Sequence, residues 1–186
     1  AIQQISGQPA IAMPPAKELY YQKALAYYKD DPAYKPLISF NYLDWRWKDN
    51  TLVSQEVPSY AYNEIMAEQA CYKALELDAA FEKAFALLVR VYYAQATETR
   101  AIEEATKEKG LQLPENETGI FSKEKPFSEK ASKMAMVGGA DHLYSALKSA
   151  ISSDENRPEV TVKILNDIGE ICKGRGDLPS VIVTAL

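Results

Sequence analysis

The chain has 186 residues, 47% of them hydrophobic and 25% charged, which is enough for one sizeable domain or two small ones. Its formal net charge of -5 argues against a nucleic-acid-binding protein, because such proteins usually carry a basic excess. No apolar run approaches the ~18–20 residues needed to span a bilayer, so we expect neither a nucleic-acid nor a membrane partner.

The two ends of the chain indicate a piece of a longer protein. The sequence begins with Ala1 rather than Met, and it stops at VIVTAL in the middle of an apolar pattern. We therefore expect a fragment or a processed chain, and the compartment stays open because this stretch carries no targeting segment. Cys71 and Cys172 lie too far apart for a CxxC motif. They are expected to be small buried hydrophobes, and whether they are free stays open.

Residues 1–50 predict an N-terminal helical pair. A Pro-Pro dipeptide opens a helix whose apolar, tyrosine-rich positions recur at a spacing of three to four, and Asp-Asp-Pro ends it. The segment YKPLISFNYLDWRW then predicts a second helix over residues 36–47, because its proline fits a first helical turn. The segment NTLVSQEVPS, residues 50–59, is typical of a loop.

The rest of the chain predicts further helices and no strand. Residues 51–109 predict a helical hairpin, in which two apolar stripes meet at an Asp-Ala-Ala corner. Residues 110–130 are polar with prolines and glycines, so we expect a loop or linker. Residues 131–186 return to apolar stripes with a spacing of three to four, separated by glycine-containing turns. No stretch shows a sustained alternation of apolar and polar residues with a period of two, so the predicted fold class is all-α.

Two patterns resemble known helical repeats. Small residues at Ala67, Cys71 and Ala74, followed by Phe85, Leu88 and Tyr92, resemble the tetratricopeptide pattern. HLYSAL at 142–147 recurs as VIVTAL after 39 residues, which resembles the period of HEAT-type helix pairs. The resemblance implies an α-solenoid-like stack of antiparallel helix pairs, with a tetratricopeptide-like centre and a truncated HEAT-like C-terminal part. Neighbouring repeats of the parent chain would then continue the stack.

The first candidate binding residues are Trp45, Arg46 and Trp47 in the segment DWRWKD. Tryptophans interleaved with cations can stack on bases or sugars, or anchor a peptide. On a helix the two tryptophans point to different sides, so a hydrophobic plug at the end of the helical pair is the competing interpretation.

The second candidate set is Lys83, Arg90 and Tyr93. The tetratricopeptide resemblance implies that these positions line a concave groove, where family members bind a carboxylate with Lys and Asn side chains. Ala86 and the lack of a nearby Asn leave that arrangement incomplete, and an ordinary helix surface is the competing interpretation.

Catalytic motifs are scarce. The single histidine, His142, follows Asp141 at the start of a predicted helix, and no HExxH, P-loop or GxSxG pattern is present. We therefore expect a non-enzymatic scaffold that binds a protein or peptide partner and needs no metal or cofactor. The alternatives are a structural spacer in a larger protein, and a helical enzyme that uses His142 with Asp141.

Overall fold

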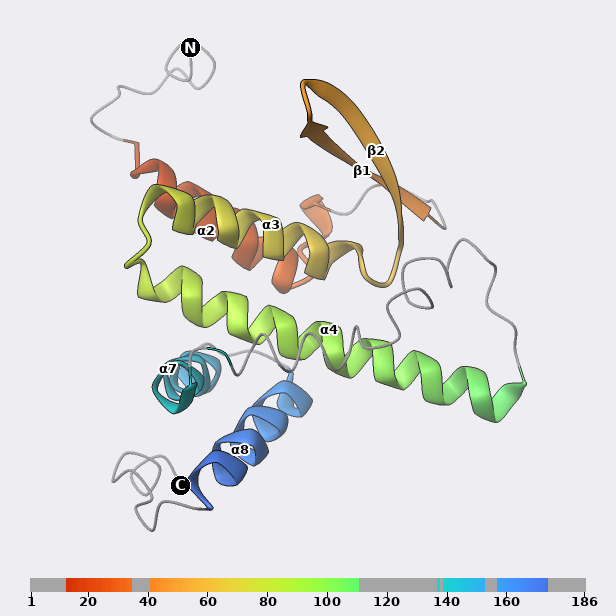
Figure 1. Cartoon of the computed structure of the whole chain (residues 1–186), viewed down its shortest axis with the longest axis vertical. Coiled ribbons are helices and arrows are strands. Elements are labelled where there is room, and N and C mark those ends of the chain that lie inside the picture. Colours follow the sequence, from red (N-terminus) through yellow and green to blue (C-terminus); the bar gives the residue numbers. More distant parts are fainter. Residues whose placement is uncertain (1–12, 35–40, 111–136, 138, 153–156, 174–186) are drawn as a thin grey trace.

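The computed structural model describes residues 13–34, 41–110, 137, 139–152 and 157–173. Its elements are α2 (Ala16–Tyr28), the 3-10 helix η2 (Pro32–Tyr34), β1 (Asn41–Lys48), β2 (Thr51–Pro58), α3 (Tyr62–Leu77), α4 (Glu82–Lys109), α7 (Gly139–Ser152) and α8 (Pro158–Cys172) (Figure 1). The expected linker at residues 110–130 lies outside the described part of the chain from residue 111 onward.

The chain is not all-α, because β1 and β2 form an antiparallel β-hairpin. Its register runs from Asn41 opposite Pro58 to Lys48 opposite Thr51. The helix expected over residues 36–47 is therefore wrong from residue 41 onward, and the loop expected at 50–59 is mostly a strand. Both strands are rich in aromatic and β-branched residues, which favour a pleated conformation, and a tight turn joins them. The prediction of an all-α solenoid is wrong, and the hairpin also crosses the expected domain boundary at residue 50.

The turn of the hairpin explains why two strands form here. Asp49 and Asn50 have φ angles of 48° and 62°, the left-handed pair that a type I′ turn requires. Asp and Asn tolerate this conformation better than other side chains do. A two-residue turn of this type matches the twist of the strands and fixes their register.

A substitution in the turn tests its contribution. Asn50→Val is expected to cost about 1–2 kcal/mol of hairpin stability, because a β-branched residue is strained at positive φ. Asn50→Gly is expected to be neutral or slightly stabilising, since glycine adopts this conformation freely. Amide hydrogen exchange across β1 and β2 measures both changes. Equal protection in the two variants would contradict the turn assignment.

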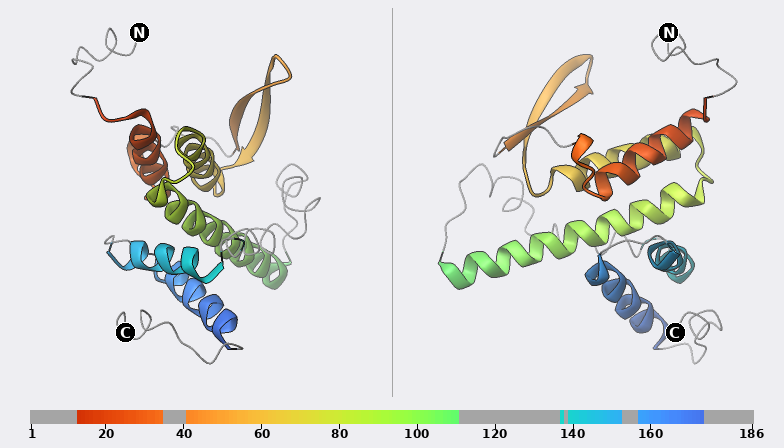
Figure 2. Two further views of the ribbon diagram at one scale, coloured as in Figure 1. Left: turned by 60° about the vertical axis from the view of Figure 1, so that its left-hand side comes forward. Right: turned by 180° about the vertical axis from the view of Figure 1, so that it is seen from behind.

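The helices form three layers, and α4 is the middle one (Figures 1 and 2). α2 and α3 lie side by side on one side of α4, and α7 and α8 lie on the other side. Small residues such as Ala24, Ala67 and Ala74 are fully buried and let α2 and α3 approach closely. The middle of α4 is buried on all sides, from Ala86 to Ala96, because it faces both outer layers.

The apolar stripes expected in the C-terminal part do face the core. Leu143, Ala146 and Leu147 of α7 are buried, as are Val160 and Ile164 of α8. They join residues of α2, α3 and α4 in one hydrophobic core. Among the described helices, none combines the length and the apolar content that a bilayer crossing requires.

Candidate functional site

The β-hairpin projects away from the three helical layers (Figures 1 and 2). Residues directly opposite each other in an antiparallel pair share a face, so Trp45, Trp47 and Leu52 lie on the same side of it. Trp45 is 56% exposed and Trp47 is 71% exposed. Other large apolar residues of the hairpin are exposed as well, namely Leu43, Leu52 and Val53. Such a concentration of exposed apolar side chains is typical of an interaction surface.

A groove lies between this hairpin and the helices α2 and α3. Its volume is about 500 Å³, which is in the range of ligand-binding clefts. α2 contributes Tyr20 and Lys23, β1 contributes Trp45 and Trp47, and α3 contributes Gln69, Ala70, Tyr72, Lys73 and Glu76. We call this surface the aromatic groove. Four of its side chains are aromatic, so it offers large and rigid contact area.

Polar contacts hold the walls of the aromatic groove in place. Gln69 Nε2 donates a hydrogen bond of 2.9 Å to Asp44 Oδ2, which ties β1 to α3. Asp44 is buried and Gln69 is half-buried, so this contact is partly shielded from water. On the rim, Lys73 Nζ lies 2.7 Å from Glu76 Oε2 in an exposed ion pair that contributes little to stability. The groove is therefore preformed.

The root of the hairpin is fixed by a second set of contacts. Val57 is buried against Ala61, with Tyr60, Tyr62 and Ile65 packed around them. The rings of Tyr42 and Tyr62 are 4.7 Å apart, and the Tyr62 ring also packs edge-on against Tyr27 at 6.2 Å. An aromatic chain thus runs from β1 through α3 to α2.

The structure does not bring the second candidate set together. Lys83 is exposed, and its Nζ lies 6.0 Å from the centroid of the Tyr21 ring. Arg90 is only 1% exposed, and its Nη1 donates a 2.9 Å hydrogen bond to Ser149 Oγ. Tyr93 is fully buried and donates to Asp167 Oδ2 at 2.8 Å. Arg90 and Tyr93 therefore join α4 to α7 and α8 instead of lining a groove with Lys83.

In the first candidate set, the two tryptophans lie together on one surface. Trp45 and Trp47 line the aromatic groove together, because residues two apart on a strand share a face. On the expected helix they would have diverged. Arg46 stands opposite Val53 in the hairpin register, and its side chain lies outside the described part of the structure.

His142 and Asp141 lie at a second, smaller hollow of about 320 Å³. Glu82, Phe85 and Ser145 share its lining, and the His142 ring packs on Phe85 with centroids 4.3 Å apart. Both His142 and Asp141 are exposed. Neighbouring residues on a helix point about 100° apart.

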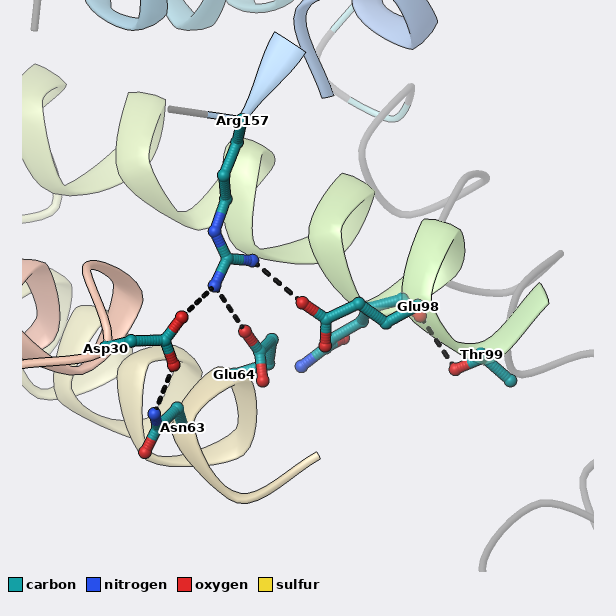
Figure 3. A network of polar contacts seen from close by, with 7 residues as sticks. Asp30, Asn63, Glu64, Glu98, Thr99 and Arg157 are labelled. Carbon is teal, nitrogen blue, oxygen red and sulfur yellow. Dashed lines mark hydrogen bonds and ion pairs between the residues drawn. The ribbon is translucent and has the colours of Figure 1, made fainter. Parts of the chain in front are cut away.

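A partly buried polar cluster, with Glu64 buried and Asp30 half-exposed, lies where α2, α3 and α4 meet (Figure 3). Arg157, just before α8, reaches across α4 into this cluster. Its Nη2 lies 3.1 Å from Asp30 Oδ2 and 3.0 Å from Glu64 Oε1, and its Nη1 lies 3.0 Å from Glu98 Oε1. Its Cζ sits 4.8 Å from the centroid of the Tyr28 ring. We call the three carboxylates and this ring the arginine cup.

The charges of the arginine cup shift its pKa values. Burial, followed by the charge of Glu64, raises the pKa of Glu98 to about 8, although Arg157 opposes the shift. Burial also raises the pKa of Glu64, again against the effect of Arg157. Burial works against the charged guanidinium, but Glu64 and Glu98 hold the pKa of Arg157 above its usual value. The cup therefore holds a proton up to a higher pH than separate carboxyl groups would. Sequence analysis missed this cluster because its members are distant along the chain.

Two observations on the described residues concern metal and thiol chemistry. No group of three or more His, Cys, Asp and Glu side chains is placed there to hold a metal ion. Cys71 is a free, buried thiol, and burial raises its pKa to about 12, which keeps it in the unreactive thiol form. The side chain of Cys172 lies outside the described part of the structure.

Comparison with known proteins does not assign the chain to a family. The chain matches no protein-family model, no curated protein and no solved structure. The resemblance to tetratricopeptide and HEAT repeats, and with it the expected contact with neighbouring repeats of a parent chain, therefore stays a prediction.

Proposed function

We propose that this chain is a non-enzymatic interaction module that binds an extended segment of a partner protein in the aromatic groove. The observation that carries the proposal is the exposure of Trp45 and Trp47 beside Tyr20 and Tyr72 in a preformed cleft. Tryptophan and tyrosine dominate the energetic hot spots of protein interfaces, and a large apolar surface left in water is costly.

The shape of the site favours an extended ligand. A two-stranded sheet has two edges, and each edge presents backbone N–H and C=O groups that an added strand can pair with. Alternate side chains of such a segment would enter the aromatic groove, while its backbone lies along the hairpin. An isolated hairpin is only marginally stable in water, so a partner strand would also stabilise it.

The two alternatives from the sequence are less well supported. A purely structural spacer gives no reason for a cleft of about 500 Å³ lined by four aromatic side chains. An enzyme that uses His142 with Asp141 needs an oriented base and a nucleophile. The exposed position of both residues on α7 does not favour that arrangement.

Tryptophan fluorescence tests the proposed binding directly, because Trp45 and Trp47 are the chain's only two tryptophans. Peptides selected from a random display library against the intact chain are the probes. We expect them to shift the emission to shorter wavelength as the indoles leave water. Trp45→Ala and Trp47→Ala are each expected to weaken affinity by about tenfold or more.

Ile151→Ala is the matched control, because Ile151 is an exposed apolar residue of α7, remote from the groove. It is expected to leave peptide affinity unchanged. Selected peptides that bind both tryptophan variants as tightly as the unaltered chain would contradict the proposal, as would a library that yields no binder.

A further inference from the structure

The arginine cup is built by elements other than the one that fills it (Figure 3). Asp30 follows the end of α2, Glu64 lies in the first turn of α3, and Glu98 lies on α4. These three helices pack on one another through the main core, whereas Arg157 comes from the start of α8. The walls of the cup therefore come from elements other than α8, although α8 packs on the same core.

Contacts within the walls hold the carboxylates before any cation arrives. Asp30 accepts a hydrogen bond from the Asn63 side chain. Glu64 is almost fully buried, and its place in the first turn of α3 puts its charge at the favourable end of the helix dipole. The Tyr28 ring is also buried, where the Arg90 guanidinium flanks it at 4.8 Å. Such a preorganised site binds its ligand at low entropic cost.

The chemistry of the cup fits a guanidinium better than any other cation. Three carboxylates meet one cation, so the cup carries surplus negative charge even when one carboxyl holds a proton. A planar fork of N–H donors reaches acceptors on separate helices, and its face stacks on an aromatic ring. A lysine ammonium offers one compact charge and no such plane.

We propose that the arginine cup is an arginine-binding site in its own right, and that Arg157 occupies it as a built-in ligand that ties the start of α8 to α2 and α3. The start of α8 is then attached because the Arg157 side chain binds the cup in the way that a separate arginine ligand would. When Arg157 is absent from the cup, an arginine side chain supplied from outside takes its place.

Chemical rescue tests this inference. Arg157→Ala removes the built-in ligand, and methylguanidinium chloride at 0–20 mM is the probe. We expect the melting temperature of the variant to rise with ln(1 + c/Kd), where c is the methylguanidinium concentration and Kd is about 1–10 mM, because a ligand of about five heavy atoms makes few contacts. N-acetylarginine amide is expected to act likewise, and the intact chain is expected to show no such rise.

The controls separate recognition from a general salt effect. Methylammonium chloride and N-acetyllysine amide are expected to have at most a third of the effect, and Arg157→Ala combined with Glu64→Gln is expected to lose the rescue. No rise in the melting temperature of the folded variant, or an equal rise with methylammonium, would overturn the inference. If Arg157→Ala is unfolded, refolding in 20 mM methylguanidinium is expected to increase its helical circular dichroism, and no increase there would overturn the inference too.

Discussion

Replacing Arg157 by alanine is expected to lower the free energy of unfolding by about 3–5 kcal/mol, the largest loss foreseen for a single polar side chain. The reason lies in what remains behind. The Arg157 side chain is 14% exposed and that of Glu64 only 3%, so the variant leaves a buried carboxylate without its counter-charge. The apolar stem of the arginine also leaves its contact with the Tyr28 ring. Urea unfolding followed by circular dichroism at pH 7 measures the change.

Arg100→Ala provides the matched control. Arg100 also pairs with a glutamate, since its Nε lies 2.9 Å from Glu104 Oε1, but both side chains are mostly exposed. Its loss is expected to cost less than about 0.5 kcal/mol. A second comparison adds Glu64→Gln to the Arg157→Ala variant, which is expected to recover part of the loss because the orphaned charge disappears. Equal effects of Arg157→Ala and Arg100→Ala would contradict the buried position of the cup.

Stability is expected to fall as the pH rises from about 5 to 9. Glu98 has a pKa of about 8 in the folded chain and near 4.5 when unfolded, so the folded state binds the extra proton between these values. This contribution is fully present below about pH 4.5 and is lost as the pH passes about 8. Glu64 has a raised pKa too and acts in the same direction. Because the Glu98 side chain is 37% exposed, water weakens the effect.

Glu98→Gln removes the titrating group and keeps the shape of the side chain. The variant is expected to show a flatter dependence of melting temperature on pH between 5 and 9, and to be at least as stable as the intact chain at pH 9. Glu104→Gln, an exposed position on the same helix, is expected to keep the original slope. A slope in Glu98→Gln equal to that of the intact chain would exclude Glu98 as the group responsible.

Helices with a clear apolar stripe could be predicted from the sequence, and the hairpin could not. The stripes of α7 and α8 recur at a spacing of three to four residues, which a helix explains and a strand does not. In β1, by contrast, Tyr42, Leu43, Trp45 and Trp47 place large apolar residues on both faces, so no clean alternation appears. The decisive signal was Asp49-Asn50, a pair suited to a type I′ turn between runs of aromatic and β-branched residues.

Only part of the candidate site could be foreseen for the same reason. The two tryptophans stand out in the sequence as large, scarce and close together, but whether they share a surface depends on the period of the backbone. The second candidate set is selected from the tetratricopeptide resemblance alone, which places Lys83, Arg90 and Tyr93 in a groove. In the structure Arg90 and Tyr93 are buried. Arg157 and Asp30, which meet at the arginine cup, are 127 residues apart, and no local pattern in the sequence records such a juxtaposition.

The place of the hairpin along the chain also bears on how the molecule folds. α2 and α3 pack side by side, yet Asp30 and Asn63, which bond where they meet, are 33 residues apart. The cost of closing such a loop falls when a local element brings its ends together first, by about 0.6 kcal/mol for each halving of the free length. Pairing Asn41 with Pro58 removes the residues between them from that free length. A hairpin forms within microseconds. We therefore expect β1 and β2 to pair early in folding, which shortens the loop that must close before α2 and α3 pack together.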